Sequence, residues 1–220
     1  MQPSTADPGR PSARRGPAPS RSTAEITAAA TELADDGGLA AVTMRAVAGA
    51  LGLAPAALYR YVTSRGELLE RMVDAALETV EPPVPTGDVE ADLVALTRAQ
   101  AAVLRRHPWL VDTLTTVRPG PGAVRALEAG LVALAPVPAG GAAKLELLAL
   151  LTGVATLFAR SSAEPAPGTI EALSSAAATH PHLAAAFARP GTAASADDLL
   201  ARSVRALTAG LLDDRSRNRG

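Results

Sequence analysis

The segment from Val42 to Leu69 constrains this chain more than any other part of the sequence. It reads VTMRAVAGALGLAPAALYRYVTSRGELL and divides into a short helix, a glycine turn, a second short helix and the start of a longer amphipathic helix. Gly52 lies at the turn, where glycine accepts a positive φ without steric cost. Ala48, four residues earlier, is small enough for two helices to cross closely. This spacing is typical of a helix-turn-helix, whose second helix lies in the major groove of DNA.

Apolar residues flank the turn at the positions that two crossing helices would bury: Val47, Leu51, Leu53 and Leu58. An ordinary corner between helices of a larger helical protein has the same spacing, so that alternative stays open. The order of the elements favours the DNA-binding interpretation. One helix precedes the pair, and a capped amphipathic helix follows it at once.

Capping signals predict where the helices of this region begin. Ser22 and Glu25 have the S-x-x-E spacing of a capping box, and Ser64 and Glu67 repeat it at the start of the long helix. Thr43 can cap the helix before the glycine turn. The expected helices run from Ser22 to the Asp-Asp-Gly-Gly at 35–38, and then over 44–51, 54–61 and 65–80. A proline-rich stretch at 81–85 ends the last of them and marks a domain boundary.

Helical periodicity continues beyond this boundary, and no segment alternates as a strand would. The expected helices cover about 89–106, 123–135, 141–160, 169–178 and 182–188, with a short segment at 109–117 and a last helix from Ser195. The fold class is therefore all-α. An N-terminal three-helix head with a helix-turn-helix, residues 22–81, is joined by its fourth helix to a larger helical domain, residues 87–214.

The first 21 residues are rich in proline and arginine and poor in large apolar residues, so we expect a disordered basic tail. The alternative is a basic arm that contacts phosphates or a minor groove. The net charge of the whole chain is only −1, so attraction to DNA must come from a local patch.

Several classes of protein are disfavoured by what the sequence lacks. Without cysteine there are no disulfides, thiolate zinc sites or cysteine nucleophiles. No P-loop, G-x-S-x-G or H-E-x-x-H motif occurs, so we expect no enzyme. His180 and His182 flank a proline with no acidic cluster nearby, so we expect a loop pair, with no metal site and no cofactor. No apolar leader is visible, and the run from Leu147 to Ala159 is too short to span a bilayer, so we expect a cytoplasmic protein without membrane contact.

The region from Ile26 to Leu69 resembles the DNA-binding head of the TetR family of bacterial repressors. The matching elements are Thr43, the Ala48-x-x-x-Gly52 spacing, the Leu-Tyr-Arg-Tyr at 58–61 and the Ser-Arg-x-Glu-Leu-Leu at 64–69. A weaker resemblance to the C-terminal domain of the tetracycline-repressor branch rests on the His-Pro-Trp at 107–109, the turn after Arg118 and the His-Pro-His-Leu at 180–183.

This resemblance implies an all-helical homodimer with a C-terminal ligand-binding and dimerisation domain. Such a protein binds a palindromic DNA operator as a repressor and is released by a small-molecule effector. The alternative is a helical small-molecule-binding or interaction protein whose DNA-binding head is degenerate.

The resemblance also assigns roles in DNA binding to particular residues. Thr43, Tyr59, Tyr61 and Arg65 match positions that contact the phosphate backbone. Arg45 and Arg60 are the candidates for guanine edges, where a bidentate contact contributes about 1–3 kcal/mol of discrimination. The start of the third helix departs from the family, because Ala54, Pro55 and Ala57 stand where base-reading side chains usually project. We therefore expect few direct hydrogen bonds to bases, with specificity depending also on DNA shape.

The larger domain offers candidates for an effector pocket. Trp109 and Phe158 are the aromatic candidates, although such residues are more often core. Their polar partners would be Gln100, His107, Thr113, Thr152 and Thr156. The apolar run at 147–158 and the last helix could form the monomer core, or a four-helix dimer interface as in TetR-like proteins. We expect the interface, because Gly153 and Ala155 allow close approach.

Overall fold

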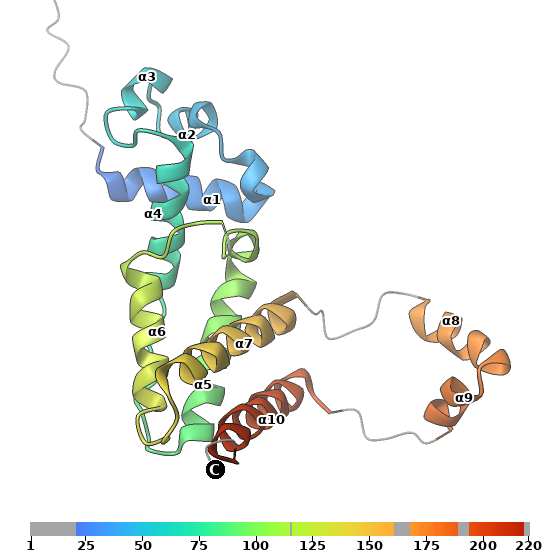
Figure 1. The fold of residues 1–220 in the computed structure, drawn as a ribbon. Helices are drawn as coiled ribbons and strands as arrows, with labels where there is room; N and C mark the ends of the chain where they lie inside the picture. Colours follow the sequence, from blue (N-terminus) through green and yellow to red (C-terminus); the bar gives the residue numbers. More distant parts are fainter. Residues whose placement is uncertain (1–20, 115, 161–167, 189–193, 218–220) are drawn as a thin grey trace, which may run out of the picture.

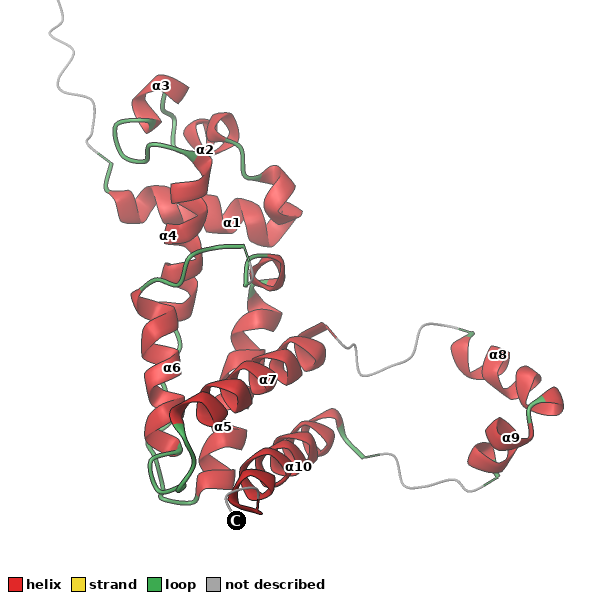
Figure 2. Cartoon of the chain, viewed as in Figure 1, coloured by secondary structure: helices red, strands yellow, loops and turns green. Residues whose placement is uncertain are grey.

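The computed structural model describes residues 21–114, 116–160, 168–188 and 194–217. Every regular element within these ranges is a helix, which confirms the all-α prediction (Figures 1 and 2). The head contains α1 (Thr23–Ala41), α2 (Met44–Ala50), α3 (Pro55–Leu58) and α4 (Arg65–Glu78). The remainder contains α5 (Val89–Arg106), η1 (Pro108–Asp112), α6 (Pro121–Ala133), α7 (Gly141–Arg160), α8 (Thr169–Ala176), η2 (Ala177–Thr179), α9 (Pro181–Phe187) and α10 (Ala196–Arg217).

The head packs around large apolar side chains that are withdrawn from water. Ile26 of α1, Val47 of α2 and Leu58 of α3 are fully buried, as are Leu68 and Met72 of α4. In α1 the buried residues Ile26, Ala30 and Ala34 are four positions apart, as are Leu68, Met72 and Ala76 in α4, so these two helices each turn one apolar face towards the core. Because α4 contributes to this core and also packs on α6, it connects the head to the larger domain (Figure 1).

Two helix ends in the head differ from the sequence prediction by three residues or more. The first helix was expected to end at the Asp-Asp-Gly-Gly of 35–38, but α1 reaches Ala41 and is interrupted at Gly38, where φ is 69°. Glycine tolerates this conformation, so helical turns form on both sides of the break. The third helix was expected to reach Tyr61, but regular α-helix ends at Leu58. Beyond it, the backbone N–H groups of Arg60 and Tyr61 donate to carbonyls three residues earlier, as in a turn.

The predicted capping box is complete at α1, whereas at α4 only one of its two hydrogen bonds forms. Ser22 and Glu25 form the complete reciprocal box at the start of α1. At α4 the Ser64 hydroxyl accepts from the backbone N–H of Glu67 as expected, at 3.1 Å. The Glu67 carboxylate, however, accepts from the backbone N–H and the hydroxyl of Thr63 at 2.7 and 2.6 Å. The acid thus reaches one residue further back than a capping box requires.

The larger domain is organised around α5, which packs against α6, α7 and α10. Helices α7 and α10 lie side by side, whereas α8 and α9 pack on each other and stand apart from α7 and α10 in Figure 1. Ser195 caps α10 by accepting from the backbone N–H of Asp198 at 3.0 Å.

Helix α7 is less buried than its composition led us to expect. Ala143, Leu147, Leu151 and Ala155 are buried, but the opposite face is open to solvent within the single chain. Within the described residues α7 is also the one helix long and apolar enough to cross a membrane, with a mean hydropathy of 1.6. Only 22% of this apolar stretch is buried, on the face that packs against α5 and α10. The helix is also longer than the apolar run at 147–159 that the sequence indicated.

Candidate functional site

The turn between α2 and α3 has the geometry of a helix-turn-helix. Gly52 has a φ of 66°, in the left-handed region that favours glycine. The backbone N–H of Leu53 donates to the carbonyl of Ala48 at 2.8 Å, and Ala48 is fully buried where the helices meet. A larger residue at position 48 would push the helices apart.

Most of the residues expected to contact DNA lie on the outside of the head. Arg45 and Arg60 are exposed, and the Tyr59 side chain is 53% exposed. Tyr61 is half-buried and packs against the core, so its ring helps to hold the turn in place. Ala54 and Pro55 are exposed at the start of α3, and Ala57 is half-buried. Because these three carry no side-chain donor, the exposed arginines and Tyr59 supply most of the hydrogen-bonding capacity of the surface.

Thr43 acts as the N-cap of α2. Its hydroxyl accepts a hydrogen bond from the backbone N–H of Ala46 at 3.1 Å, while the residue itself remains exposed. The side chain therefore fixes the start of α2 at the surface of the head. Such a helix start can receive a phosphate oxygen.

Arg65 makes contacts that the sequence analysis did not anticipate. Its Nε donates to the carbonyl of Val42 at 2.8 Å, and its Nη2 donates to the carbonyl of Leu39 at 2.6 Å. Both carbonyls lie at the C-terminal end of α1, where the Leu39 carbonyl also accepts from the backbone N–H of Val42 at 3.3 Å. The guanidinium therefore fastens the start of α4 to the junction between α1 and α2.

Of the tail, the structure describes only Arg21. Its guanidinium pairs with Glu25 at 3.1 Å and approaches the carbonyl of Leu51 at 3.4 Å. Arg21 therefore belongs structurally with the head, where it links α1 to the end of α2. The arginines at 10, 14 and 15, on which the prediction of a DNA-contacting arm depends, lie outside the described residues.

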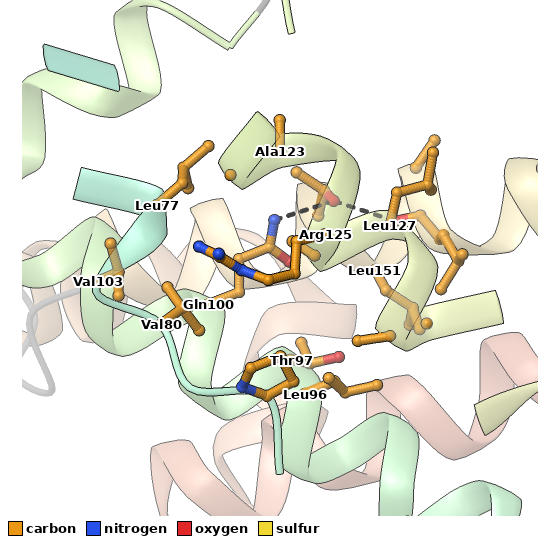
Figure 3. A pocket seen from close by; sticks show the side chains of 18 of the residues that line it. Leu77, Val80, Leu96, Thr97, Gln100, Val103, Ala123, Arg125, Leu127 and Leu151 are labelled. Carbon is orange, nitrogen blue, oxygen red and sulfur yellow. Dashed lines mark hydrogen bonds between the residues drawn. The ribbon is translucent and has the colours of Figure 1, made fainter. Parts of the chain in front are cut away.

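The larger domain contains a cavity of about 440 Å³ between the end of α4 and helices α5, α6 and α7 (Figure 3). Its walls are mostly leucine, valine and alanine side chains. Gln100 of α5 and Thr152 of α7 line it and are joined by a hydrogen bond of 3.1 Å. These two residues were among the candidates from the sequence. Arg125, the only charged residue in the lining, was not.

The other candidate pocket residues lie outside this cavity. Thr113 is fully buried and donates to the carbonyl of Leu110 at 2.6 Å. Thr156 donates to the carbonyl of Thr152 at 2.9 Å, and Phe158 packs against the core. Their side chains are therefore engaged within the protein. Sequence periodicity does not show which face of α6 meets a cavity, and α6 carries two charged residues, Arg125 and Glu128, of which only Arg125 lines it.

His107 and Trp109 form a polar contact with the head. The Trp109 Nε1–H donates to the Asp35 carboxylate at 2.7 Å, and the His107 Nδ1 lies 2.8 Å from the same oxygen. Both rings are buried and meet edge to face, with their centroids 6.0 Å apart. Asp35 belongs to α1, so this cluster ties the first helix of the head to the end of α5 and to η1. A second hollow, of about 490 Å³, lies beside it and is lined by Asp35 and Trp109.

A second link between the two regions is made by Asp74 of α4. Its carboxylate accepts a hydrogen bond from the backbone N–H of Gly122 in the first turn of α6. Acidic groups are favoured at this end of a helix, because the free N–H groups carry partial positive charge. Helix α6 forms one wall of the cavity. This hydrogen bond therefore joins that wall directly to α4, the helix that carries the head.

Comparison with known proteins agrees with this arrangement. Residues 26–72 match the family described as bacterial regulatory proteins, tetR family. The chain is 40% identical over 132 residues to the HTH-type transcriptional repressor DrrR1 of Streptomyces coeruleorubidus, an alignment that covers 58% of this chain and 48% of DrrR1. It spans about half the length of the curated relatives it matches, 48% in one case and 52% in the other.

Solved structures are similar over most of the chain. The Streptomyces coelicolor protein SCO7704 is 33% identical with a TM-score of 0.66, covering 89% of this chain and 96% of that one. The TetR family protein ActR of Streptomyces coelicolor, in complex with (S)-DNPA, has a TM-score of 0.73 at 24% identity, covering 89% of this chain and 98% of that one. The matched head, the shared fold and the relatives together show that this chain belongs to the TetR family of bacterial regulatory proteins.

Proposed function

We propose that this protein is a ligand-responsive transcriptional repressor that binds a palindromic operator as a homodimer and releases it when a small molecule enters the cavity. The observation that carries the proposal is that α4 belongs to both sites. One end of α4 packs in the head, and the other end borders the cavity and is fastened to α6 through Asp74. A ligand that moves α6 therefore acts directly on the helix that supports the head.

The proposed DNA surface consists of Thr43, Arg45, Tyr59 and Arg60. The arginines and the tyrosine hydroxyl are exposed donors, and the start of α2 is positioned to receive a phosphate. Because the base-facing start of α3 is made of alanine and proline, base discrimination rests on the two arginines and on DNA shape. DrrR1, the relative that shares 40% identity over its matched region, is a repressor, which supports the same role here.

The proposed dimer interface is the open face of α7 together with α10. Leu150 and Leu157 of α7 are 46% and 62% exposed, and Leu199 of α10 is 42% exposed. A methyl group added at Gly153 would meet no atom of the described residues within 4 Å, so this face has room for a close partner. Apolar side chains on two adjacent helices are suited to a four-helix contact between two copies.

A random-site selection followed by fluorescence-anisotropy titration tests the proposal. We expect a palindromic consensus, affinity that falls steeply with salt, and several-fold weaker binding for Arg45→Ala and Tyr59→Ala. Arg98→Ala is the matched control, because Arg98 is exposed in the larger domain and pairs with Asp197, away from the head. Unchanged affinity in both head variants would contradict the assigned surface.

A second candidate function is a helical ligand-binding protein whose head no longer reads DNA. The alanine-rich start of α3 favours this alternative. So does Arg65, whose guanidinium donates to the carbonyls of Val42 and Leu39, which leaves fewer of its donors for a phosphate. In that case the random-site selection would enrich no sequence, while small molecules would still bind the cavity. Enrichment of a palindrome rejects this alternative.

A further inference from the structure

The cavity between α4, α5, α6 and α7 has a distinctive combination of walls and charge. Apolar side chains form most of its surface, and no carboxylate lines it among the described residues. Arg125 is its single charged group. Figure 3 shows this side chain extending from α6 across the cavity towards Gln100 and Val80. Within the described part of the chain, no acidic group neutralises Arg125 by an ion pair.

We infer that the cavity takes an apolar small molecule bearing one acidic group, such as a carboxylate, sulfonate or acidic phenol, whose anion pairs with Arg125. This inference rests on the proposed function and specifies the effector class for the same site. An anion at Arg125 gains charge-assisted hydrogen bonds from a planar fork of donors, and the apolar walls weaken competition from water.

The same arginine selects against neutral ligands. Arg125 is exposed at the side of the cavity, so a wholly apolar molecule beside it would displace water from the guanidinium without replacing those hydrogen bonds. Burying a charged group without a partner is unfavourable. A cationic ligand would meet repulsion from Arg125 and find no carboxylate in the lining. Charge therefore discriminates among ligands of equal size.

Gln100 supplies a second point of recognition, and its orientation follows from its neighbours. The Thr152 hydroxyl donates to the carbonyl of Leu148 at 3.0 Å, so its oxygen is left to accept. The contact of 3.1 Å with Gln100 must then be a donation from the Gln100 amide nitrogen. This fixes the Gln100 carbonyl oxygen as an acceptor for the cavity. A ligand with an N–H or O–H group beside its apolar body would satisfy it.

Two fluorescent probes separate charge from shape. 8-Anilinonaphthalene-1-sulfonate and N-phenyl-1-naphthylamine share the same rings and the same N–H group and differ in the sulfonate. We expect the full-length protein to bind the sulfonate at least five-fold more tightly. Arg125→Gln should weaken binding of the sulfonate by five-fold or more and change binding of the neutral probe by less than two-fold. Arg125→Lys, which keeps the charge, should restore most of the preference.

Control variants place the probes in the cavity. Arg105→Gln removes an exposed arginine of α5 that does not line the cavity and should leave both affinities unchanged. Ala126→Trp, whose side chain would fill the cavity, should reduce the binding of both probes. Circular dichroism checks that each variant is folded. Equal affinity for the two probes, or a sulfonate preference that survives Arg125→Gln, would overturn the inference.

The operator assay then distinguishes the two proposals. A charge preference that depends on Arg125 supports the acidic-ligand inference whether or not a probe affects DNA binding. If no probe affects DNA binding, the result counts against effector-driven release. If the neutral probe releases the operator as well as the sulfonate does, in the wild type and in Arg125→Gln alike, release stands and the acidic-ligand inference fails.

Discussion

The Asp74 carboxylate of α4 meets the backbone N–H of Gly122 in the first turn of α6. The contact leaves no room for a side chain at Gly122. A Cβ there would lie 2.8 Å from the Asp74 carbonyl oxygen and 3.1 Å from the Leu77 Cβ. Glycine thus lets the wall of the cavity touch the helix that carries the head, and the two helices can transmit a displacement without an intervening side chain.

Gly122→Ala should separate α4 from α6. We expect it to lower the free energy of unfolding by about 1–3 kcal/mol, as overpacking usually does, and to weaken the effect of a ligand on DNA affinity. Chemical denaturation and anisotropy measure the two effects. Gly49→Ala is the control, because its Cβ meets nothing within 4 Å. That variant should be neutral or up to about 1 kcal/mol more stable, since alanine is the better helix former. Wild-type stability in Gly122→Ala would refute the close contact.

Asp35→Ala should destabilise the junction between the head and the larger domain. The change removes the acceptor for the buried Trp109 N–H and the buried His107 ring, and an unsatisfied buried donor costs about 1–3 kcal/mol. Denaturation with tryptophan fluorescence follows it directly, because Trp109 is the only tryptophan in the chain. The neighbouring exposed Asp36, changed to alanine, should alter stability by less than about 0.5 kcal/mol. Equal losses in the two variants would argue against the cluster.

Arg65 offers a test of positioning against direct DNA contact. Lysine keeps the positive charge but cannot reproduce the two directed bonds to the carbonyls of Val42 and Leu39. If Arg65 positions the head, Arg65→Lys should lose about 1 kcal/mol of stability, nearly as much as Arg65→Ala. If it acts mainly on phosphate, Arg65→Lys should retain operator affinity and stability while Arg65→Ala loses affinity alone. Thermal unfolding and anisotropy on the same variants separate these outcomes.

The head was predictable from sequence because its signals are local. Ala48, Gly52 and the caps at Ser22 and Thr43 act within one or two helical turns, and their spacing is visible in the chain. The misjudged details are also local but depend on competing partners. Helix α1 continues past Asp35 because Gly38 absorbs the break, and Glu67 prefers Thr63 to the backbone of Ser64.

The cavity was only partly predictable because its residues meet through tertiary packing. Gln100 and Thr152 are 52 positions apart and come together only because α5 packs against α7. His107 and Trp109 are polar and aromatic, the composition expected of a pocket. Their partner Asp35, however, lies more than 70 positions away in the head, and no periodicity reveals that pairing.

The Glu67 carboxylate makes the stability of the head depend on pH. Hydrogen bonds from the hydroxyl and backbone N–H of Thr63, followed by that from Arg71, lower its pKa from 4.5 to about 2. A carboxyl group whose pKa is lowered by folding stabilises the native state above its unfolded pKa, and this contribution disappears as the pH falls from about 4.5 towards 2. The melting temperature of the wild type should therefore fall more steeply over this interval than that of Glu67→Gln. Glu70→Gln, altered at an exposed position in the same helix, should keep the steep wild-type dependence. Parallel profiles for the wild type and Glu67→Gln would show that the Thr63 contact does not form in solution.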